Sequence, residues 1–231
     1  EIYTLSLHDA LPISIVGSGN LGSGELLKSQ SLRADKIICA DGGIRYFKQS
    51  QIIPDLVIGD LDSATEDEVA WIYEKAISIE QYPMEKDATD MELCIKYLVN
   101  NGYNDIVILG GIGTRLDHTL ANLFTVQKFV EYGVKIKMAD DINEYFVVDK
   151  GMSIPKKENQ FCSIIPMNST EVIVTLKGFH YNLNGRVLKF GETMGVSNYV
   201  EEDFGHIIVE KEICAGLWRS EERRVGKECR S

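Results

Sequence analysis

One short stretch, Leu56–Ser63, constrains the fold of this chain more than any other. An apolar run ends there in Gly59, and two carboxylates follow at Asp60 and Asp62. The run predicts a buried β-strand, and ligands of open α/β sheets bind at the carboxyl ends of such strands. Two bare carboxylates are costly to desolvate unless a cation compensates them, and Mg²⁺ prefers oxygen ligands of this kind. A solvated turn rich in Asp and Ser explains the stretch equally well when it is taken alone.

The composition of the 231 residues is ordinary for a soluble globular protein, with 44% hydrophobic and 26% charged residues. The length suits one large domain or two small ones. The net charge of −11 argues against nucleic acid as a partner, because no basic stripe offsets phosphate repulsion. No apolar run approaches the roughly 20 residues that span a bilayer, so we expect no membrane partner. Five cysteines without metal-ligand spacing indicate a reducing, cytoplasmic protein.

Both ends of the sequence differ in character from the rest. Residues 1–14 lack the basic start and the long apolar core of a signal peptide. The charged run at residues 219–231 resembles nothing upstream, and both ends look like translated adapter sequence. We therefore expect non-native tails over residues 1–14 and 215–231, and we expect that residues 212–217 do not continue as a final strand.

Residues 15–150 alternate between short apolar runs and segments with helical periodicity, which predicts an α/β domain with a parallel sheet. Glycine-rich turns follow predicted strands at residues 13–16 and 105–109. Such turns are typical of phosphate sites, although a plain flexible connection accounts for the turn after residue 16 at least as well. The sequence thus favours a nucleotide-binding domain here without deciding how the phosphates are held.

After residue 150 the helical periodicity disappears. Short alternating or β-branched runs take its place, at residues 161–165, 171–176, 181–183 and 207–209. Turn residues separate several of these runs, a pattern typical of an antiparallel sandwich or barrel. The sequence therefore predicts a second, all-β domain over residues 151–214.

Carboxylates follow several predicted strand ends, or begin helices, in the α/β domain. They are Asp41, Asp60 with Asp62, Asp87 with Asp90, and Asp117. In a parallel sheet these positions share one edge, and a rim of negative charge without a counter-ion is costly. Capping of a helix is a competing explanation for Asp87 and Asp90. Together with Lys86 and Arg115, the rim suits a magnesium–polyphosphate complex.

Five motifs, taken in order, resemble those of the thiamine pyrophosphokinase family. They are residues 40–43 (ADGG), 54–55 (PD), 59–63 (GDLDS), 87–90 (DATD) and 115–122 (RLDHTLAN), and Ser197 with Asn198 fits as well. The likeness extends from Ile15 to Val209. It implies a Rossmann-like α/β nucleotide-binding domain, a C-terminal β-sandwich that binds thiamine, and a homodimer with its sites at the subunit interface.

The resemblance implies an enzyme that transfers the pyrophosphoryl group of ATP to the hydroxyethyl oxygen of thiamine, giving thiamine diphosphate and AMP. The metal would be Mg²⁺, held by Asp60, Asp62 and Asp90. The implied catalytic residues are Asp60, Asp62, Asp90, Arg115 and Asp117, and the implied nucleotide-binding residues are Asp41, Gly42, Lys86, Asp87, Thr89 and Arg115. The implied thiamine-binding residues are Ser197, Asn198 and Tyr199, with Tyr199 as the candidate for stacking on the pyrimidine ring.

Two other functions stay open at the level of the sequence. A haloacid-dehalogenase-like phosphatase also has Asp-x-Asp after an apolar strand, and Asp140 with Asp141 mimics its later acidic pair. That family places its first aspartate near the chain start, whereas two predicted strands precede Asp60 here. A non-catalytic nucleotide- or thiamine-binding protein on the same scaffold is the other alternative, although a sensor has no need of every carboxylate.

Overall fold

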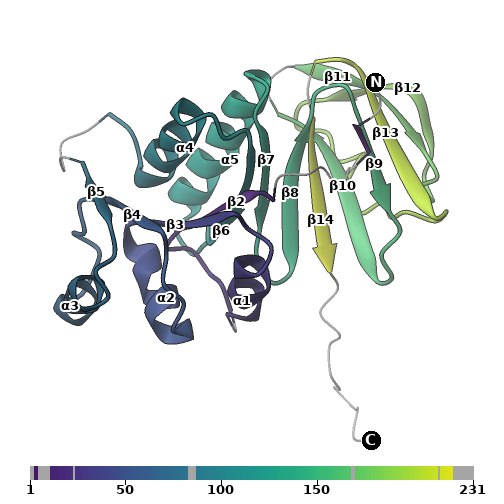
Figure 1. The fold of residues 1–231 in the computed structure, drawn as a ribbon. Coiled ribbons are helices and arrows are strands. Elements are labelled where there is room, and N and C mark those ends of the chain that lie inside the picture. The colour runs from purple at the N-terminus through teal and green to yellow at the C-terminus, as the bar shows by residue number, and fades with distance from the viewer. Residues whose placement is uncertain are drawn as a thin grey trace, which may run out of the picture. The chain divides into compact units, whose positions relative to one another are not determined.

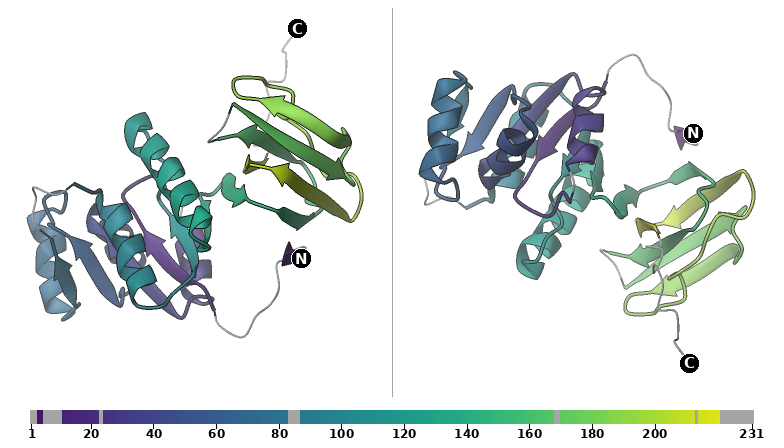
Figure 2. Two further views of the ribbon diagram at one scale, coloured as in Figure 1. Left: turned by 90° about the horizontal axis from the view of Figure 1, so that it is seen from above. Right: turned by 90° about the horizontal axis from the view of Figure 1, so that it is seen from below.

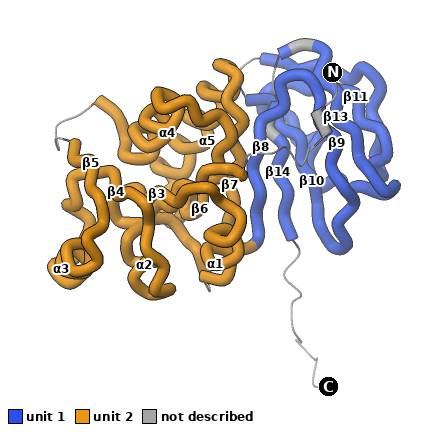
Figure 3. The backbone as a smooth tube through the Cα atoms, in the orientation of Figure 1, with its two compact units in different colours: residues 1–6, 142–231 blue, residues 7–141 orange. Residues whose placement is uncertain are grey.

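The computed structural model describes residues 11–22, 24–82, 87–167, 170–212 and 214–220, together with the backbone of residues 3–4. The chain forms two compact units, which Figure 3 colours separately. One unit comprises residues 7–141, and the other comprises residues 142–231 with residues 1–6. The first is α/β and the second is all-β, which confirms the fold class predicted from the sequence.

The α/β unit is built on a parallel sheet in the order β7-β6-β2-β3-β4-β5. From β2 the chain adds strands on one side as far as β5, and it then returns to add β6 and β7 on the other side. The order therefore reverses between β2 and β6, and doubly wound sheets bind ligands beside such a switch point. The strands are β2 (Ile13–Val16), β3 (Lys36–Ala40), β4 (Leu56–Gly59), β5 (Ile79–Gln81), β6 (Asp105–Leu109) and β7 (Lys135–Ala139).

Helices cover both faces of this sheet (Figure 1). α4 (Asp90–Asn100) and α5 (Leu116–Glu131) lie on one face, and α1 (Glu25–Ser31), α2 (Ile44–Ser50) and α3 (Glu66–Glu74) lie on the other. Because both faces are covered, the strands are apolar along most of their length, and β2 is buried at every residue. In the described part of the chain, none of the helices is long and apolar enough to cross a membrane.

Threonine side chains cap two of these helices. Thr65 accepts a hydrogen bond from the Glu68 amide at the start of α3, and the Glu68 carboxylate accepts one from the Thr65 amide in return. Thr89 accepts a hydrogen bond from the Glu92 amide at 3.2 Å and so begins α4. The capping position of α4 thus belongs to Thr89, and Asp90 is the first residue of the helix.

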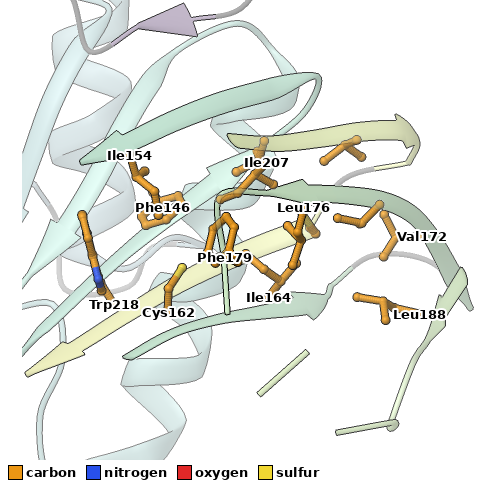
Figure 4. Close-up of a cluster of buried hydrophobic side chains, with 14 of the residues drawn as sticks. Phe146, Ile154, Cys162, Ile164, Val172, Leu176, Phe179, Leu188, Ile207 and Trp218 are labelled. Atoms are coloured by element: carbon orange, nitrogen blue, oxygen red, sulfur yellow. The ribbon is translucent and has the colours of Figure 1, made fainter. Parts of the chain in front are cut away.

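The β unit consists of two sheets that face each other across an apolar core (Figure 4). One sheet has the order β9-β13-β11-β12, with β1 (Tyr3–Thr4) parallel to β9 at its edge, and within the unit the other has the order β10-β14-β8. Phe146, Ile164 and Trp218 enter the core from the second sheet, which confirms the predicted sandwich. The strands are β8 (Asn143–Val148), β9 (Gly151–Pro155), β10 (Gln160–Pro166), β11 (Glu171–Lys177), β12 (Leu183–Lys189), β13 (Phe204–Lys211) and β14 (Cys214–Ser220).

The last strand differs from what the sequence suggested. Residues 212–217 were not expected to continue as a strand, yet β14 lies between β8 and β10 and pairs with both. Trp218 is only 4% exposed. The strand is hard to recognise in the sequence because Gly216 interrupts its apolar alternation. A Cβ on Gly216 would lie 2.1 Å from the Phe146 ring, so the fold needs glycine at that point.

The bounds of the compact units also differ from those expected. β8 pairs with β14, and the compact β unit begins at residue 142, before the expected domain start at residue 151. β14 extends through residue 220, past the expected start of a tail at residue 215. Ile13 and Ser14 lie in β2, which confirms the strand predicted at residues 13–16, although the expected tail also included these two residues. In each case strand pairing with a distant partner, which local composition does not reveal, decides the boundary.

Replacing Trp218 with Ala should lower the free energy of unfolding by about 3–5 kcal/mol, because a buried ring is lost from the core of the β unit. Phe190 is 69% exposed in the same unit, and Phe190→Ala should change that free energy by less than about 0.5 kcal/mol. Urea unfolding followed by circular dichroism measures both variants. A loss below about 1 kcal/mol for Trp218→Ala would contradict the packing of β14 into the core.

Candidate active site

Three carboxylates converge at the carboxyl edge of the parallel sheet. Asp41 follows β3 directly, in the short 3₁₀ helix η1 (Asp41–Gly43), and Asp60 and Asp62 follow β4. β3 and β4 are parallel neighbours, so the turns after them meet at one edge. Oxygens of Asp41, Asp60 and Asp62, one from each, all lie within 4.8 Å of one another. We call these three residues the acidic cluster.

The backbone at the acidic cluster adopts conformations that most residues avoid. Asp41 has a φ of 38°, and Leu61, between the other two aspartates, has a φ of 64°. Each such left-handed residue costs about 1–3 kcal/mol and persists only where the surroundings enforce it. Gly59 has a φ of 151°, and a Cβ on it would lie 2.9 Å from the Asp41 Cβ. Gly59 therefore permits the close approach of the two turns, and the strain favours a functional role for them.

Asp41 is a buried carboxylate with incomplete hydrogen bonding. The residue is 6% exposed, and its Oδ1 finds no hydrogen-bond partner among the residues that the structure describes. Burial raises the pKa of Asp41, and the nearby charges of Asp90 and Asp62 add to this, while hydrogen bonds from Ser63 and Gly42 oppose it. A cation beside Asp41 would both engage Oδ1 and favour the ionised carboxylate.

The other two carboxylates are held by bonds within their own turn. The Asp62 amide donates to Asp60 Oδ1 at 3.2 Å, and the Ser63 hydroxyl donates to Asp62 Oδ1 at 3.0 Å. These bonds orient the carboxylates without neutralising their charge. Asp60 is half-buried and Asp62 is exposed, so the acidic cluster opens toward solvent on the side of this turn.

The acidic cluster fits a hard divalent cation such as Mg²⁺, because carboxylates from two adjacent turns offer oxygen ligands around one point. The sequence predicts Asp60, Asp62 and Asp90 as metal ligands, and the structure brings the first two together. Asp90 begins α4 and is not part of the cluster, although its charge acts on Asp41. Asp41, which the sequence suggested for nucleotide binding, is the third member of the cluster.

The glycine-rich turns after β2 and β6 bind each other. The amides of Gly17, Gly19 and Asn20 donate to carbonyls in residues 109–112 at 2.7–2.8 Å. A Cβ on Gly19 would lie 2.3 Å from the Ile112 carbonyl oxygen, so this contact requires glycine. These three amides are therefore engaged within the protein and do not form the phosphate cradle that the pattern after β2 suggested.

Arg115 and Asp117 form an exposed, bidentate ion pair at the start of α5. Arg115 Nη2 lies 2.6 Å from Asp117 Oδ2, and Arg115 Nε lies 3.3 Å from Oδ1. The hydrogen bond from Arg115 lowers the pKa of Asp117 to about 2. Asn122 donates to the Gly111 carbonyl at 2.8 Å and fastens the turn that precedes Arg115. The motif contains Asn122, but its positioning role becomes visible only when this contact is known.

The remaining nucleotide-site candidates occupy varied positions. Thr89 caps α4, and Asp87 is exposed just before it. Gly42 is buried in η1, where a Cβ would lie 3.2 Å from the Ser63 Cβ, so the small residue lets η1 pack against the turn after β4. Lys86 lies outside the described residues.

Ser197, Asn198 and Tyr199 lie in the segment between β12 and β13 of the β unit. Ser197 is exposed with a φ of 60°, and its amide donates to the Ser163 hydroxyl at 3.1 Å. Asn198 is buried, and its Oδ1 accepts hydrogen bonds from the Tyr181 and Tyr199 amides at 3.0 and 2.9 Å. Its Nδ2 donates to the Tyr181 carbonyl at 2.8 Å. Asn198 therefore fixes the backbone of this segment, a structural role that the motif did not predict.

A cavity of about 340 Å³ lies beside Tyr199 in the β unit. Residues 156–161, which contain the turn between β9 and β10, bound it on one side, and residues 199–201 bound it on another. Phe161 is a second aromatic residue among those that line it. A cavity with two aromatic rings and charged side chains suits a flat, polar molecule.

Two family models match most of the chain. The model described as the catalytic domain of thiamin pyrophosphokinase matches residues 27–138, and the model described as its vitamin B1 binding domain matches residues 151–214. A thiamine pyrophosphokinase of Bacillus subtilis is 34% identical over 163 residues, which cover 70% of this chain and 76% of that relative. The chain belongs to the thiamin pyrophosphokinase family.

Other members of the thiamin pyrophosphokinase family agree with this assignment. Thiamine pyrophosphokinase 1 of Oryza sativa is 26% identical over 207 residues, which cover 78% of each chain. The crystal structure of thiamine pyrophosphokinase from Bacillus subtilis matches with a TM-score of 0.82 at 28% identity, over 91% of this chain and 100% of that one. The yeast thiamin pyrophosphokinase structure has a TM-score of 0.77 at 16% identity, over 94% and 90% of the two chains, and supports the fold alone.

The two family models cover the two groups of candidate residues separately. The acidic cluster and the Arg115–Asp117 pair lie in the segment that matches the catalytic model of the thiamin pyrophosphokinase family. Ser197, Asn198 and Tyr199 lie in the segment that matches the vitamin B1 binding model. Membership of this family removes the haloacid-dehalogenase-like alternative.

Replacing Asn198 with Ala should lower the free energy of unfolding by about 2–4 kcal/mol, because two amides and one carbonyl lose their side-chain partner. Asn184 is exposed on β12 and provides a matched control, and Asn184→Ala should change that free energy by less than about 0.5 kcal/mol. Chemical denaturation measures both variants. Equal stabilities of the two variants would exclude the structural role of Asn198.

Replacing Arg115 with Gln should raise the pKa of Asp117 from about 2 toward the ordinary value of about 3.9, because the charge and hydrogen bonds of the guanidinium are lost. The wild-type ion pair should accordingly persist down to about pH 2, where Asp117 takes up a proton. NMR titration of the Asp117 carboxyl carbon measures the shift, with Arg33→Gln as the control. A pKa of Asp117 that is the same in Arg115→Gln and in the wild type would contradict the pairing.

Proposed function

We propose that this chain is a thiamine pyrophosphokinase, which transfers the terminal pyrophosphoryl group of ATP to the hydroxyethyl oxygen of thiamine. The products are thiamine diphosphate and AMP. The observation that carries the proposal is the acidic cluster, which lies at the carboxyl edge of a parallel sheet and within the segment that matches the catalytic model. The similarity to thiamine pyrophosphokinases of Bacillus subtilis and Oryza sativa supports the same reaction.

Mg²⁺ is the cation that we propose for the acidic cluster, with Asp90 contributing charge from the start of α4. The buried Asp41 Oδ1, which finds no partner among the described residues, supports a cation at this point. Bound there, Mg²⁺ would neutralise charge on the phosphate oxygens of ATP. Asp60 and Asp62 are already oriented by the bonds of their own turn, so they need little rearrangement to act as ligands.

Arg115 is the residue that we propose to bind a phosphate group of ATP. Its guanidinium is exposed, and the bidentate contact with Asp117 holds the plane of the group in one orientation. Because α5 begins at this point, the positive end of the helix dipole adds to the attraction for an anion. Gly42, Lys86, Asp87 and Thr89 complete the nucleotide site in this proposal.

Thiamine supplies the nucleophile in the proposed reaction. Its hydroxyl oxygen attacks the β-phosphorus, the bond from that phosphorus to the bridging oxygen of the α-phosphate breaks, and AMP leaves with that oxygen. The hydroxyl proton passes to a carboxylate, and Asp62 and Asp90 are the candidates. The negative rim also attracts the cationic thiazolium ring, while Ser197, Asn198 and Tyr199 are proposed to bind thiamine from the β unit.

Two wider features belong to the same proposal. We propose a homodimer, in which the thiamine-binding residues of one subunit serve a site shared with the other. We also propose a cytoplasmic location, because Cys39, Cys94, Cys162 and Cys214 are free thiols, as proteins of a reducing compartment commonly have.

The test is to incubate the chain with ATP, Mg²⁺ and thiamine and to separate the nucleotide products. AMP and thiamine diphosphate should form in equal amounts, and Asp60→Asn and Asp62→Asn should lower kcat/KM by more than about 100-fold, as loss of a group that stabilises transition-state charge does. Asp105→Asn is the matched control, since Asp105 is exposed at the opposite end of β6, and its activity should equal that of the wild type.

Three outcomes would contradict the proposed function. Formation of ADP in place of AMP would indicate a simple kinase. Absence of any turnover, with nucleotide or thiamine still bound, would favour the non-catalytic binding protein. Full activity of the Asp60→Asn and Asp62→Asn variants would remove the acidic cluster from the reaction.

A further inference from the structure

Two aromatic rings contact the imidazole of His180 in the β unit. The imidazole of His180 stacks on the ring of Tyr199, with 4.6 Å between the ring centroids and 14° between the planes. Tyr181 contacts the same imidazole edge-on, at 4.6 Å and 78°. Offset stacking and edge-to-face contacts are the arrangements that aromatic rings prefer, so the three rings form an ordered group.

The backbone on both sides of this stack is fixed. The His180 amide donates to the Tyr199 carbonyl at 3.0 Å, and Phe179 and Val200 form an antiparallel bridge beside it. Asn198 binds the amides of Tyr181 and Tyr199 with one oxygen. The Cα atoms that carry the imidazole and the phenol are therefore held at a fixed spacing.

The imidazole itself is held at its edge. His180 Nδ1 lies 3.2 Å from Glu201 Oε1, and the side chains of the two residues are 39% and 58% exposed. A contact this exposed adds little to the stability of the fold. The contact with Glu201 instead restricts rotation of the imidazole, so that the face of the imidazole stays against the Tyr199 ring.

Tyr199 also lines a cavity in the β unit. It lines the cavity of about 340 Å³ together with Phe161 and Glu201, whereas His180 does not line that cavity. Glu201, which contacts the imidazole of His180, also lines the cavity, so the cavity lies beside the aromatic stack. Tyr199 therefore takes part both in the stack with His180 and in the lining of a cavity that can hold a small molecule.

We propose that His180 is a positioning residue for thiamine binding: it holds the Tyr199 ring in the orientation that stacks on the aminopyrimidine ring of thiamine. This inference rests on the proposed function, in which Tyr199 binds thiamine. Glu201 assists by restraining the imidazole. An unsupported tyrosine would have to lose rotational freedom on binding, and the stack removes that cost beforehand.

The experiment compares steady-state kinetics of the full chain and its variants with thiamine and ATP varied separately. His180→Ala should raise the KM for thiamine about three- to tenfold, which corresponds to the cost of ordering one free side chain on binding, while kcat and the KM for ATP stay within about twofold of the wild type. His180→Phe keeps the flat ring and should restore the KM for thiamine to within about twofold of the wild type. Glu201→Gln should have an intermediate effect, with Glu202→Gln as its unaffected neighbour.

Calorimetric binding of thiamine without ATP, and the unfolding temperature of each variant, complete the test. His180→Ala should weaken thiamine binding by the same factor as it raises KM, and its unfolding temperature should stay well above the assay temperature. An unaltered KM for thiamine in His180→Ala, a parallel rise in the KM for ATP, or failure of His180→Phe to restore KM would each overturn the positioning role. Those results leave wild-type formation of AMP intact, whereas a wild type that neither binds nor converts thiamine overturns the proposed function and this inference together.

Discussion

Electrostatic repulsion among three carboxylates dominates the candidate active site. Asp41, Asp60 and Asp62 bring negative charge within 4.8 Å at the edge of one sheet. The repulsion between two unit charges 4 Å apart is about 1 kcal/mol in water. It is about 4 kcal/mol at the effective dielectric constant near a protein surface. The fold enforces this arrangement because β3 and β4 are buried parallel neighbours. The turns that follow them must therefore lie side by side at the same edge of the sheet. A divalent cation converts the same repulsion into a binding site.

Glycine and hydrogen-bonded turns maintain this edge of the sheet. Gly59 lets the Asp41 turn approach β4, and the turns after β2 and β6 bind each other through Gly17 and Gly19. Asn122 fastens the turn before Arg115 in a similar way. The β unit uses the same principle, since Asn198 fixes the segment that carries Tyr199. In both units, polar side chains and glycines shape the turns, and the apolar cores hold the elements that these turns connect.

Much of the fold follows from the sequence because its periodicities are strong. The apolar run before Gly59 predicts β4, and parallel pairing then places Asp60 and Asp62 at the edge where Asp41 lies. Local pattern could not predict that Asp41 joins these two residues in the cluster in place of Asp90, because that depends on a left-handed backbone at Asp41. Local pattern also could not reveal that the amides of the glycine-rich turn after β2 donate their hydrogen bonds to the turn after β6. The sequence does not predict β14, because Gly216 breaks the alternation of apolar and polar residues along the strand. Gly216 is needed there because the Phe146 ring leaves no room for a side chain.

In the proposed site, the acidic cluster binds the divalent cation that carries the polyphosphate. Anomalous diffraction from crystals of the chain grown with Mn²⁺ and a non-hydrolysable ATP analogue would locate this cation. A manganese peak is expected within about 2.5 Å of carboxylate oxygens of Asp41, Asp60 and Asp62, with a phosphate oxygen as a further ligand. A manganese peak that contacts the phosphates but none of these three carboxylates would contradict the proposed site.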